Sequence, residues 1–487
     1  MAHERPGSLS RTGAVVAAGV LLWLIGTYSR SLWIDEFHSL FHARAPDLLT
    51  FFASVRMDNH PPLSFLLIRW STQVFGETPL ALRLPAMLAG VLYLVVLVRL
   101  ARRLPDAGAR RLLPWLGVLS TLCFTIFCEA RMYGWLALAV LGSVEAILAG
   151  FDGRRSRWWL ALWVGLGLHS HYYFLHYGLV LSALVACVAA LDRSRREAAR
   201  SLFAPALLGL VVSMPWIVWG LVAQLEHGMP AGSNYSSVAD FVQSLGHLFF
   251  MGMSYVGSWL TYGVALPGTA AVAVAAVLGV GALWRAHEGR DRLLMLFLVG
   301  GAALAPAWAW LASLTSERVS YNWRYVAGST GPALALVAMG LSVGSGRARA
   351  ALRVLVVGTM LVVTVFVALS PGQENWRGVV RLILERAEPG DAVLVKPLWD
   401  LDHEHSPTGY DYYAPRLAGD DPFPPEIRTR DWRLALEHER VWVIECGYYP
   451  KPVIIELRAA FAQENLTNVG GALIVHLFHD KVEQGGR

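Results

Sequence analysis

Long apolar runs separated by short polar stretches dominate the first 370 residues of the chain. A helix needs about 17 to 25 apolar residues to cross a bilayer, and runs of that length predict about eleven membrane spans in this sequence. They lie near residues 13–29, 84–101, 112–130, 132–150, 158–175, 174–191, 202–222, 265–284, 293–312, 326–343 and 353–370. Pro62–Phe75 is also apolar, but its length is more typical of a short helix lying at the membrane surface.

The pattern changes after Pro371, where charged residues and prolines become frequent and no run is long enough to span. Periodicity and turn residues predict shorter elements there. These are helices at Asn375–Arg386 and Lys451–Gln463 and strands at Asp391–Lys396, Arg440–Glu445 and Ala472–Phe478. Alternating helices and strands predict a small α/β domain. We therefore expect a transmembrane domain over residues 1–370 and a soluble α/β domain over residues 371–487.

Composition supports this division. The 487 residues are 55% hydrophobic and 16% charged, with a mean hydropathy of +0.45, which is too apolar for a soluble protein of this size. The net charge is +5, but the basic residues form short clusters between spans and no continuous patch, which argues against a nucleic-acid partner. The four cysteines have no metal-ligand spacing. The first apolar run lacks a convincing cleavage site and is predicted to remain as a span.

Basic clusters predict the orientation, because lysine and arginine in short loops face the cytoplasm. If the N-terminus is cytoplasmic, all five clusters fall on the cytoplasmic side, provided that Pro62–Phe75 does not cross the membrane. The clusters are Arg102–Arg111, Arg154–Arg157, Arg193–Arg200, Arg285–Arg292 and Arg347–Arg353. The alternate loops and the C-terminal domain then face the periplasm or the exterior, as in a multi-pass protein of a bacterial inner membrane.

The outward loops collect the residues with candidate chemistry. Asp35 and Glu36 follow the first span, and a lone acid pair at this position would be interpreted first as the cap of an amphipathic helix. Each charged residue at the end of another span could likewise be an interfacial anchor. Their gathering at one surface predicts a functional site, because carboxylates suit general-base catalysis and arginines suit phosphate. The other members are His60, Arg83, Glu129, Arg131, Tyr133, His169, His171, Tyr172, Tyr173, Arg324 and Tyr325.

These segments resemble the successive motifs of bacterial glycosyltransferase family 39, which is related to the protein O-mannosyltransferases and the aminoarabinose transferases. The motifs are Leu32–Glu36, His60–Leu63, Phe75–Gly76 with Ala81–Pro85, Glu129–Tyr133, His171–Tyr173 and Arg324–Tyr325. They occur in order over roughly residues 30 to 345. The resemblance implies an α-helical polytopic protein with the GT-C fold, in which residues 30–83 form a catalytic periplasmic loop with interfacial helices.

The resemblance also implies a reaction. A sugar passes, with inversion, from a polyprenyl-phosphate-linked donor to a hydroxyl of an acceptor glycan, lipid or protein at the periplasmic face of the bilayer. In this scheme Asp35 is the general base and Glu36 orients the acceptor or the base. The donor phosphate is bound by His60, Arg83, Arg131, Arg324 and Tyr325. Glu129, Tyr133, His171 and Tyr172 are expected to contact substrate.

Three alternatives remain at the level of sequence. His60, Glu129 and His171 are of metal-ligand type, so a divalent ion is an alternative that their spacing does not decide; no other cofactor is expected. A transporter would also have many spans, but it should show internal repeats and helices broken at the membrane midplane. A non-catalytic glycolipid-binding membrane protein would not need Asp35. The run Asp400–His405 has ligand-type residues, but we interpret it as a solvated charge run.

The orientation leads to the first testable prediction. Reporter fusions after Arg103, Arg155, Arg196 and Arg290 should give cytoplasmic signals, and fusions near Ser54 and Asp411 should give periplasmic signals, because basic loops stay on the cytoplasmic side. A periplasmic signal at Arg103 would show that Pro62–Phe75 crosses the membrane and would separate the motifs onto two faces.

Overall fold

A computed structural model of the chain describes residues 7–226, 237–250, 261–286, 289–315, 321–344, 346–395, 407–427, 432–446, 452–469 and 473–481. The chain divides into two units. The helical unit runs up to Gly26 and continues over Ala45–Ala368, and the C-terminal unit combines Thr27–Arg44 with the residues from Leu369 onward. Thr27–Arg44, which the sequence assigned to the transmembrane domain together with the rest of the catalytic loop, therefore packs with the C-terminal residues instead.

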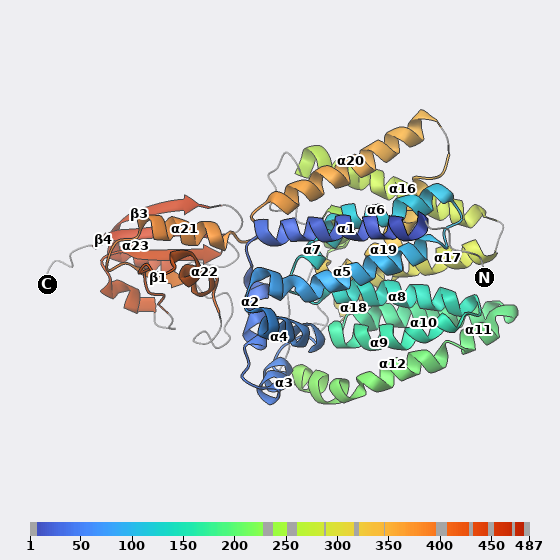
Figure 1. The fold of residues 1–487 in the computed structure, drawn as a ribbon, viewed down its shortest axis with the longest axis horizontal. Helices are drawn as coiled ribbons and strands as arrows, with labels where there is room; N and C mark the ends of the chain where they lie inside the picture. The colour runs from blue at the N-terminus through green and yellow to red at the C-terminus, as the bar shows by residue number, and fades with distance from the viewer. Residues whose placement is uncertain are drawn as a thin grey trace. The chain divides into compact units, whose positions relative to one another are not determined.

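The helical unit is a bundle in which helices distant in sequence pack together (Figure 1). Its α-helices are α1 (Gly7–Ser29), α3 (Leu48–Arg56), α4 (Leu63–Phe75), α5 (Pro79–Ala101), α6 (Ala107–Leu119), α7 (Thr121–Phe127), α8 (Tyr133–Phe151), α9 (Trp159–Ser170), α10 (Phe174–Leu191), α11 (Arg196–Arg200), α12 (Phe203–Trp216), α13 (Val222–Glu226), α14 (Val238–Phe250), α16 (Leu266–Arg285), α17 (Gly289–Val299), α18 (Ala305–Thr315), α19 (Thr330–Gly340) and α20 (Arg347–Leu369). Helix α8 packs against α5 and α9, and α19 packs against α6 and α16. Run 400–405 lies outside the described residues.

The multi-pass helical fold is confirmed. Among the described residues, 8 helical segments are long and apolar enough to cross a membrane, or 9 if the pair α6 and α7, bent by 54°, is one span. The two remaining predicted windows are α9, with 12 residues, and α19, with 11. Each follows a 3-10 segment directly, so the predicted window is helical but its regular α-helix is short. Helix α4 has 13 residues and is not among the candidate spans, in agreement with its prediction as a non-spanning helix.

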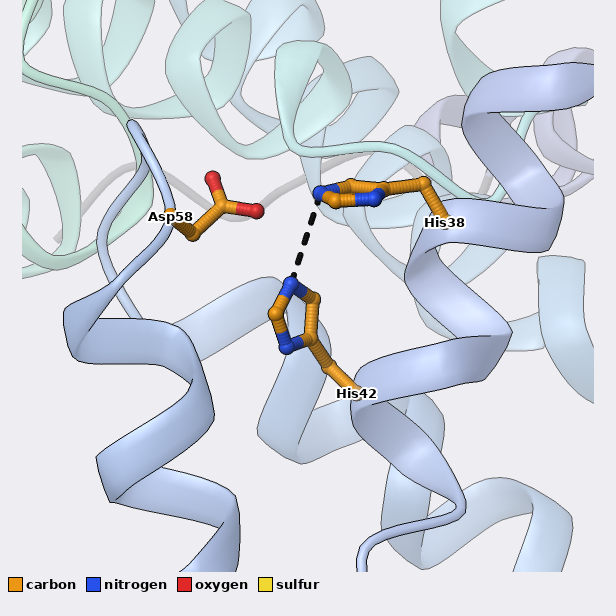
Figure 2. A group of neighbouring side chains, drawn as sticks. All are labelled: His38, His42 and Asp58. Atoms are coloured by element: carbon orange, nitrogen blue, oxygen red, sulfur yellow. Dashed lines mark hydrogen bonds between the residues drawn. The ribbon is translucent and has the colours of Figure 1, made fainter. Parts of the chain in front are cut away.

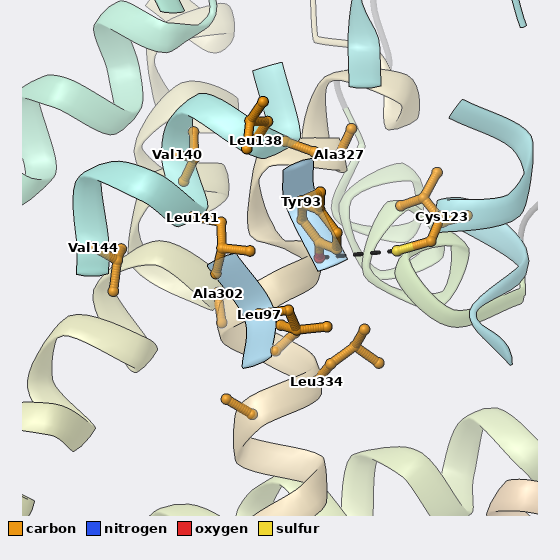
Figure 3. Packing of buried hydrophobic residues seen from close by; sticks show 14 of the residues in the cluster. Tyr93, Leu97, Cys123, Leu138, Val140, Leu141, Val144, Ala302, Ala327 and Leu334 are labelled. Atoms are coloured by element: carbon orange, nitrogen blue, oxygen red, sulfur yellow. Dashed lines mark hydrogen bonds between the residues drawn. The ribbon is translucent and has the colours of Figure 1, made fainter. Parts of the chain in front are cut away.

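The core of the helical unit surrounds α8, where 94% of the apolar window is buried. Figure 3 shows Leu138 and Leu141 of α8 beside Tyr93 of α5, whose hydroxyl accepts a hydrogen bond from the Cys123 thiol with an S–O distance of 3.9 Å. The hydroxyl and the thiol thereby satisfy one another inside an apolar cluster. Such pairing matters because an unpaired buried polar group costs free energy.

Helices α16 and α19 approach at two glycines. A Cβ atom on Gly279 would lie 1.9 Å from the carbonyl oxygen of Leu336, and one on Gly340 would lie 1.6 Å from that of Ala275. Neither position can hold a side chain without moving a backbone. Close approach at small residues is a usual way to associate helices in a membrane, where lipid removes most of the hydrophobic drive for helix contact.

An ion-pair network joins α5 to α8 near the end of each helix. Arg103 contacts Glu145 at 3.2 Å and Asp152 at 2.5 Å, and Arg99 contacts the second oxygen of Glu145 at 3.3 Å. Glu145 is nearly fully buried, and Arg99 and Arg103 compensate its negative charge. A buried charge left without its partner is strongly destabilising, and the network therefore fixes the register of the two helices.

The C-terminal unit contains a four-stranded sheet with order β1-β2-β4-β3. Its elements are α2 (Ile34–Ala43), α21 (Trp376–Arg386), β1 (Ala392–Val395), α22 (Gly409–Ala418), β2 (Val441–Cys446), α23 (Pro452–Ala460), β3 (Phe461–Asn468) and β4 (Leu473–Lys481). Strands β1 and β2 are parallel, and β4 is antiparallel to β2 and to β3. Ile454 and Leu457 of α23 complete a core with Val443 and Phe478 of the sheet.

The predicted small α/β domain is confirmed, with two differences. The helix predicted to end at Gln463 stops at Ala460, and Phe461–Asn468 forms a strand whose side chains are mostly exposed, so it lacks the alternating pattern that identifies strands. Helix α22 was not predicted. It begins with a Thr408 cap whose hydroxyl accepts from the Asp411 N–H, and its Pro415 obscures the helical signal.

Candidate functional site

The Asp35–Glu36 motif opens helix α2 of the C-terminal unit. Asp35 is partly exposed, whereas Glu36 is fully buried. Glu36 Oε2 accepts the N–H of Trp33, the N-cap residue, at 3.3 Å, which is the glutamate half of a capping box. The capping interpretation weighed from the sequence therefore holds for Glu36, and it leaves Asp35 as the acid of the pair with access to solvent.

Two histidines missed by the sequence analysis follow on the same helix. His38 and His42 are one turn apart, with the His-x-x-x-His spacing that places both rings on one face. Figure 2 shows the rings turned toward each other, and their Nε2 atoms lie 3.4 Å apart. Two neutral imidazoles in this arrangement are usual ligands of a transition metal, although an ion would need further ligands.

In the helical unit, Asp58 holds His60. The Asp58 carboxylate oxygen Oδ1 accepts the N–H of His60 at 2.9 Å and lies 3.0 Å from its Nδ1 atom. An imidazole whose Nδ1 faces a carboxylate carries its proton there, so the carboxylate selects the ring's tautomer and orientation. The sequence pointed to His60 but assigned no role to Asp58.

His60 belongs to a compact group of aromatic rings. Its ring centroid lies 5.2 Å from that of His171, which is 5.7 Å from Tyr133 and 4.8 Å from Tyr325. Tyr173 joins the group at 4.4 Å from Tyr325. Five of the candidate residues, His60, Tyr133, His171, Tyr173 and Tyr325, are thus brought together. They come from the loop before α4, the start of α8, the turn between α9 and α10, and the 3-10 segment Trp323–Ser329.

His169 and His171 have different surroundings because α9 ends between them. His169 remains in the helix, where Nδ1 lies 2.8 Å from the Gly165 carbonyl oxygen. His171 is in an extended conformation, and its Nδ1 accepts the N–H of Tyr173 at 3.1 Å. The proton of a neutral His171 ring therefore resides on Nε2, which is buried and has no hydrogen-bond partner among the described residues. His171 offers a donor to the aromatic group, whereas His169 does not take part.

Gln224 of α13 joins the loop before α4 to the turn that contains Tyr172. Its amide nitrogen donates to the carbonyl oxygens of Val55 at 2.8 Å and His60 at 3.2 Å. Its amide oxygen accepts the Tyr172 hydroxyl at 2.6 Å, and Tyr172 accepts the Trp216 N–H at 2.9 Å. Tyr172 is thus linked to the His60 loop by hydrogen bonds through Gln224. No sequence motif marks residues 223–262, so the role of Gln224 could not be identified from the sequence alone.

Three of the predicted charged residues are almost entirely buried in the helical unit: Arg83 at 1% exposure, Glu129 at 2% and Arg131 at 4%. Arg131 follows Glu129 in a tight turn before α8. The ligand atoms of His60, Glu129 and His171 do not come within 4.8 Å of one another in the described part of the chain, so this trio is not a preformed metal site.

Arg324 is partly buried beside helix α14, which the sequence analysis did not predict. The Arg324 N–H donates to the Asn322 side chain at 3.0 Å, and Tyr321 is hydrogen-bonded to Ser244 of α14 at 2.6 Å. Burial and the Arg324 charge lower the pKa of His247, also on α14, to about 4. His247 is therefore a neutral ring at physiological pH, near a fixed positive charge.

Comparison with known proteins confirms the resemblance. Residues 59–219 match the family model described as dolichyl-phosphate-mannose-protein mannosyltransferase. ArnT from Cupriavidus metallidurans in the apo state is 14% identical, with a TM-score of 0.58 over 97% of this chain and 98% of that chain. ArnT from the same organism bound to undecaprenyl phosphate is 14% identical, with a TM-score of 0.55 over 96% of this chain and 98% of that chain. No curated protein matches in sequence.

The arabinofuranosyltransferase AftD from Mycobacteria is also similar, at 14% identity and a TM-score of 0.50, over 96% of this chain and 40% of that chain. The chain therefore has the GT-C fold. The matched family segment contains His60, Arg83, Glu129, Arg131, Tyr133, His171 and Tyr172, so it covers most of the candidate residues of the helical unit.

The Gln224 contacts generate a second prediction. Gln224→Met keeps the length of the side chain but leaves the Val55 and His60 carbonyl groups without this donor. We expect the free energy of unfolding to fall by about 1–3 kcal/mol, the cost of unsatisfied buried groups, measured by thermal unfolding in detergent. Gln73→Met, at an exposed position of α4, is the matched control. Equal melting temperatures for both variants would contradict the assigned role.

Proposed function

We propose that the protein is a membrane glycosyltransferase that transfers a sugar, with inversion, from a polyprenyl-phosphate-linked donor to a hydroxyl acceptor at the periplasmic face. The observation that carries this proposal is the burial of Arg83, Glu129 and Arg131 at the motif positions of a GT-C fold. Charged side chains are costly inside an apolar bundle and are usually retained there for function. The family match over residues 59–219, to a model described as a mannosyltransferase, supports the proposal of sugar transfer.

Asp35 is the proposed general base. Its carboxylate takes the proton of the acceptor hydroxyl while the acceptor oxygen attacks the anomeric carbon of the sugar. The bond from that carbon to the phosphate oxygen breaks, and the lipid phosphate leaves with the electron pair. Attack from the face opposite the phosphate inverts the anomeric centre. The partial exposure of Asp35 supports this role, because a base must reach substrate.

The developing negative charge on the leaving phosphate calls for fixed cations. Arg83, Arg131 and Arg324 are proposed to supply them, since guanidinium groups remain charged and bind phosphate through two parallel hydrogen bonds. His60, held by Asp58, and Tyr325 are proposed as further donors to phosphate oxygens. Preorganised donors of this kind stabilise the transition state without having to reorient.

Glu129, Tyr133, His171 and Tyr172 are proposed to contact the sugar or the acceptor. ArnT, which shares the fold, has been crystallised with undecaprenyl phosphate, and a lipid-linked donor of that kind is the proposed substrate class here. The acceptor is a glycan, a lipid or a protein. Mass spectrometry of envelope glycans and lipids, with and without the gene, identifies the product as the species that disappears.

The third prediction tests the base. Asp35→Asn keeps the shape of the side chain but cannot take a proton, so formation of that product should fall by a factor on the order of 10² to 10⁴. Glu36→Gln should lower product formation less, because an amide oxygen can still accept the Trp33 N–H. Expression and binding of undecaprenyl phosphate should be retained in both. Product formation at the wild-type level by Asp35→Asn would remove Asp35 from the mechanism.

The fourth prediction tests the phosphate contacts. Lysine supplies charge without the two-pronged geometry, so Arg→Lys at one or more of positions Arg83, Arg131 and Arg324 should lower both undecaprenyl phosphate affinity and product formation by about tenfold or more. Arg154→Lys, at an exposed position on the helical unit, is the control and should change neither. Unchanged affinity in alanine variants of all three positions would exclude them from the phosphate site.

A further inference from the structure

We infer that Glu374 and Tyr413 are positioning residues for Asp35, so that the C-terminal unit sets the geometry of the general base. This inference rests on the proposed function and adds to it a task for the C-terminal residues, to which no motif assigns one. It follows from the hydrogen bonds at the start of α2, from the packing of the same helix, and from the contacts at both ends of Thr27–Arg44.

Four successive backbone N–H groups immediately before Asp35 have identified acceptors. The first N–H groups of a helix have no partner within the helix, so acceptors must come from elsewhere. Ser31 donates to the Pro371 carbonyl oxygen at 2.9 Å, Leu32 to the Tyr413 hydroxyl oxygen at 2.8 Å, Trp33 to Glu36 at 3.3 Å and Ile34 to Glu374 at 3.0 Å. Three of the four acceptors thus belong to residues more than 330 positions later in the chain.

Glu374 is itself held in place. It is 1% exposed, and the oxygen that accepts from Ile34 also accepts the Trp376 indole N–H at 2.7 Å. A carboxylate at this position also interacts favourably with the partial positive charge of the α2 N-terminus. The Glu374 carboxylate is therefore a fixed acceptor. It determines where the first turn of α2 begins and thereby fixes the backbone position of Asp35.

Aromatic packing fixes the rotation of α2 about its axis. The Phe37 ring lies 6.2 Å from that of Trp376, 5.7 Å from Tyr412 and 6.5 Å from Tyr413. Phe37 is nearly fully buried among these rings. Because Phe37 is two residues after Asp35 and points about 200° away from it on a helix, burial of Phe37 turns Asp35 outward from this packed face.

Contacts at both ends complete the attachment. The Arg377 guanidinium donates to the Tyr28 carbonyl oxygen at 2.7 Å, and the Arg377 N–H donates to the Ser31 hydroxyl at 3.2 Å. Arg44, at the end of α2, lies 3.9 Å from Asp411. The segment is thus held before, at and after Asp35. Such holding matters for a general base, because about 1 Å of misplacement can cost on the order of 10² in rate.

Four variants of the full-length protein test the inference. Tyr413→Phe and Glu374→Leu each remove one acceptor, whereas Glu374→Gln keeps an oxygen that can accept from Ile34. Tyr410→Phe is the matched control, because the Tyr410 hydroxyl on the same helix α22 makes a comparable buried hydrogen bond, 2.8 Å long, to the Pro424 carbonyl oxygen and none to the Asp35 segment.

Hydrogen exchange by mass spectrometry gives a readout independent of activity. Peptides covering residues 31–37 should exchange about tenfold faster in Tyr413→Phe and Glu374→Leu than in the wild type, Glu374→Gln or Tyr410→Phe. In complemented cells, Tyr413→Phe and Glu374→Leu should lower product formation by about 10- to 100-fold. Undecaprenyl phosphate affinity should stay within about threefold of the wild type, because the proposed phosphate contacts lie in the helical unit.

A double variant separates positioning from stability. If Tyr413 acts through Asp35, adding Tyr413→Phe to Asp35→Asn should cause no further loss of product, since residues that act as a unit are not additive. Exchange at residues 31–37 equal to that of Tyr410→Phe would overturn the inference, as would faster exchange with undiminished product. Should Glu374→Leu fail to fold, Tyr413→Phe and Glu374→Gln decide the question.

Failure of the proposed function gives a different result. If Asp35 is not the base, Asp35→Asn keeps wild-type product formation, whatever the exchange data show. If Asp35 is the base but is not positioned by the C-terminal unit, Asp35→Asn loses activity while Tyr413→Phe behaves like Tyr410→Phe.

Discussion

The free-energy cost of leaving buried polar groups without partners shapes this structure more than any single apolar contact. In a low-dielectric interior an unpaired donor, acceptor or charge is expensive, and the chain contains many of these groups close to apolar helices. This cost favours the pairing of Arg103 with Glu145 between α5 and α8 and the bond that joins Gln224 to the backbone before α4. Each N–H group from Ser31 to Ile34 likewise has an acceptor. Loops that carry candidate chemistry are thereby held in defined positions.

Much of the architecture follows from the sequence, because apolar length and basic loops are local properties. Every predicted span corresponds to a helix, although α9 and α19 are shortened where 3-10 segments precede them. Contacts between distant residues could not be predicted in this way. Nothing near Asp35 in the sequence indicates that the Leu32 N–H donates to Tyr413, and Gln224 lies in a stretch without any motif. His247 was likewise recognisable only once folding had set it beside Arg324. Asp58 is different, because it lies two residues before His60 and its local contact with that ring was overlooked in the sequence.

The arrangement of charges also bears on the competing functions. A transporter moves its substrate across the bilayer and concentrates polar groups near the midplane, where helices are interrupted. Here four of the buried residues with candidate chemistry lie near helix ends: Arg83 near the start of α5, Glu129 and Arg131 in the turn before α8, and His171 at the end of α9. Under the proposed function, these helix ends lie at the membrane surface, where a lipid phosphate and an aqueous acceptor can meet.

Adjacent acids need not share a task, and the first turn of α2 illustrates why. Consecutive residues on a helix point about 100° apart, so Asp35 and Glu36 cannot face the same surroundings. Glu36 turns inward, where its oxygen closes the N-cap, and an acid used in this way has little freedom to meet a substrate. Asp35 remains partly exposed, and the four N–H groups before it, from Ser31 to Ile34, all have acceptors. Under the proposed function, the cap contributes to catalysis without taking part in it, because a helix that begins at a fixed residue gives the Asp35 carboxylate a fixed direction.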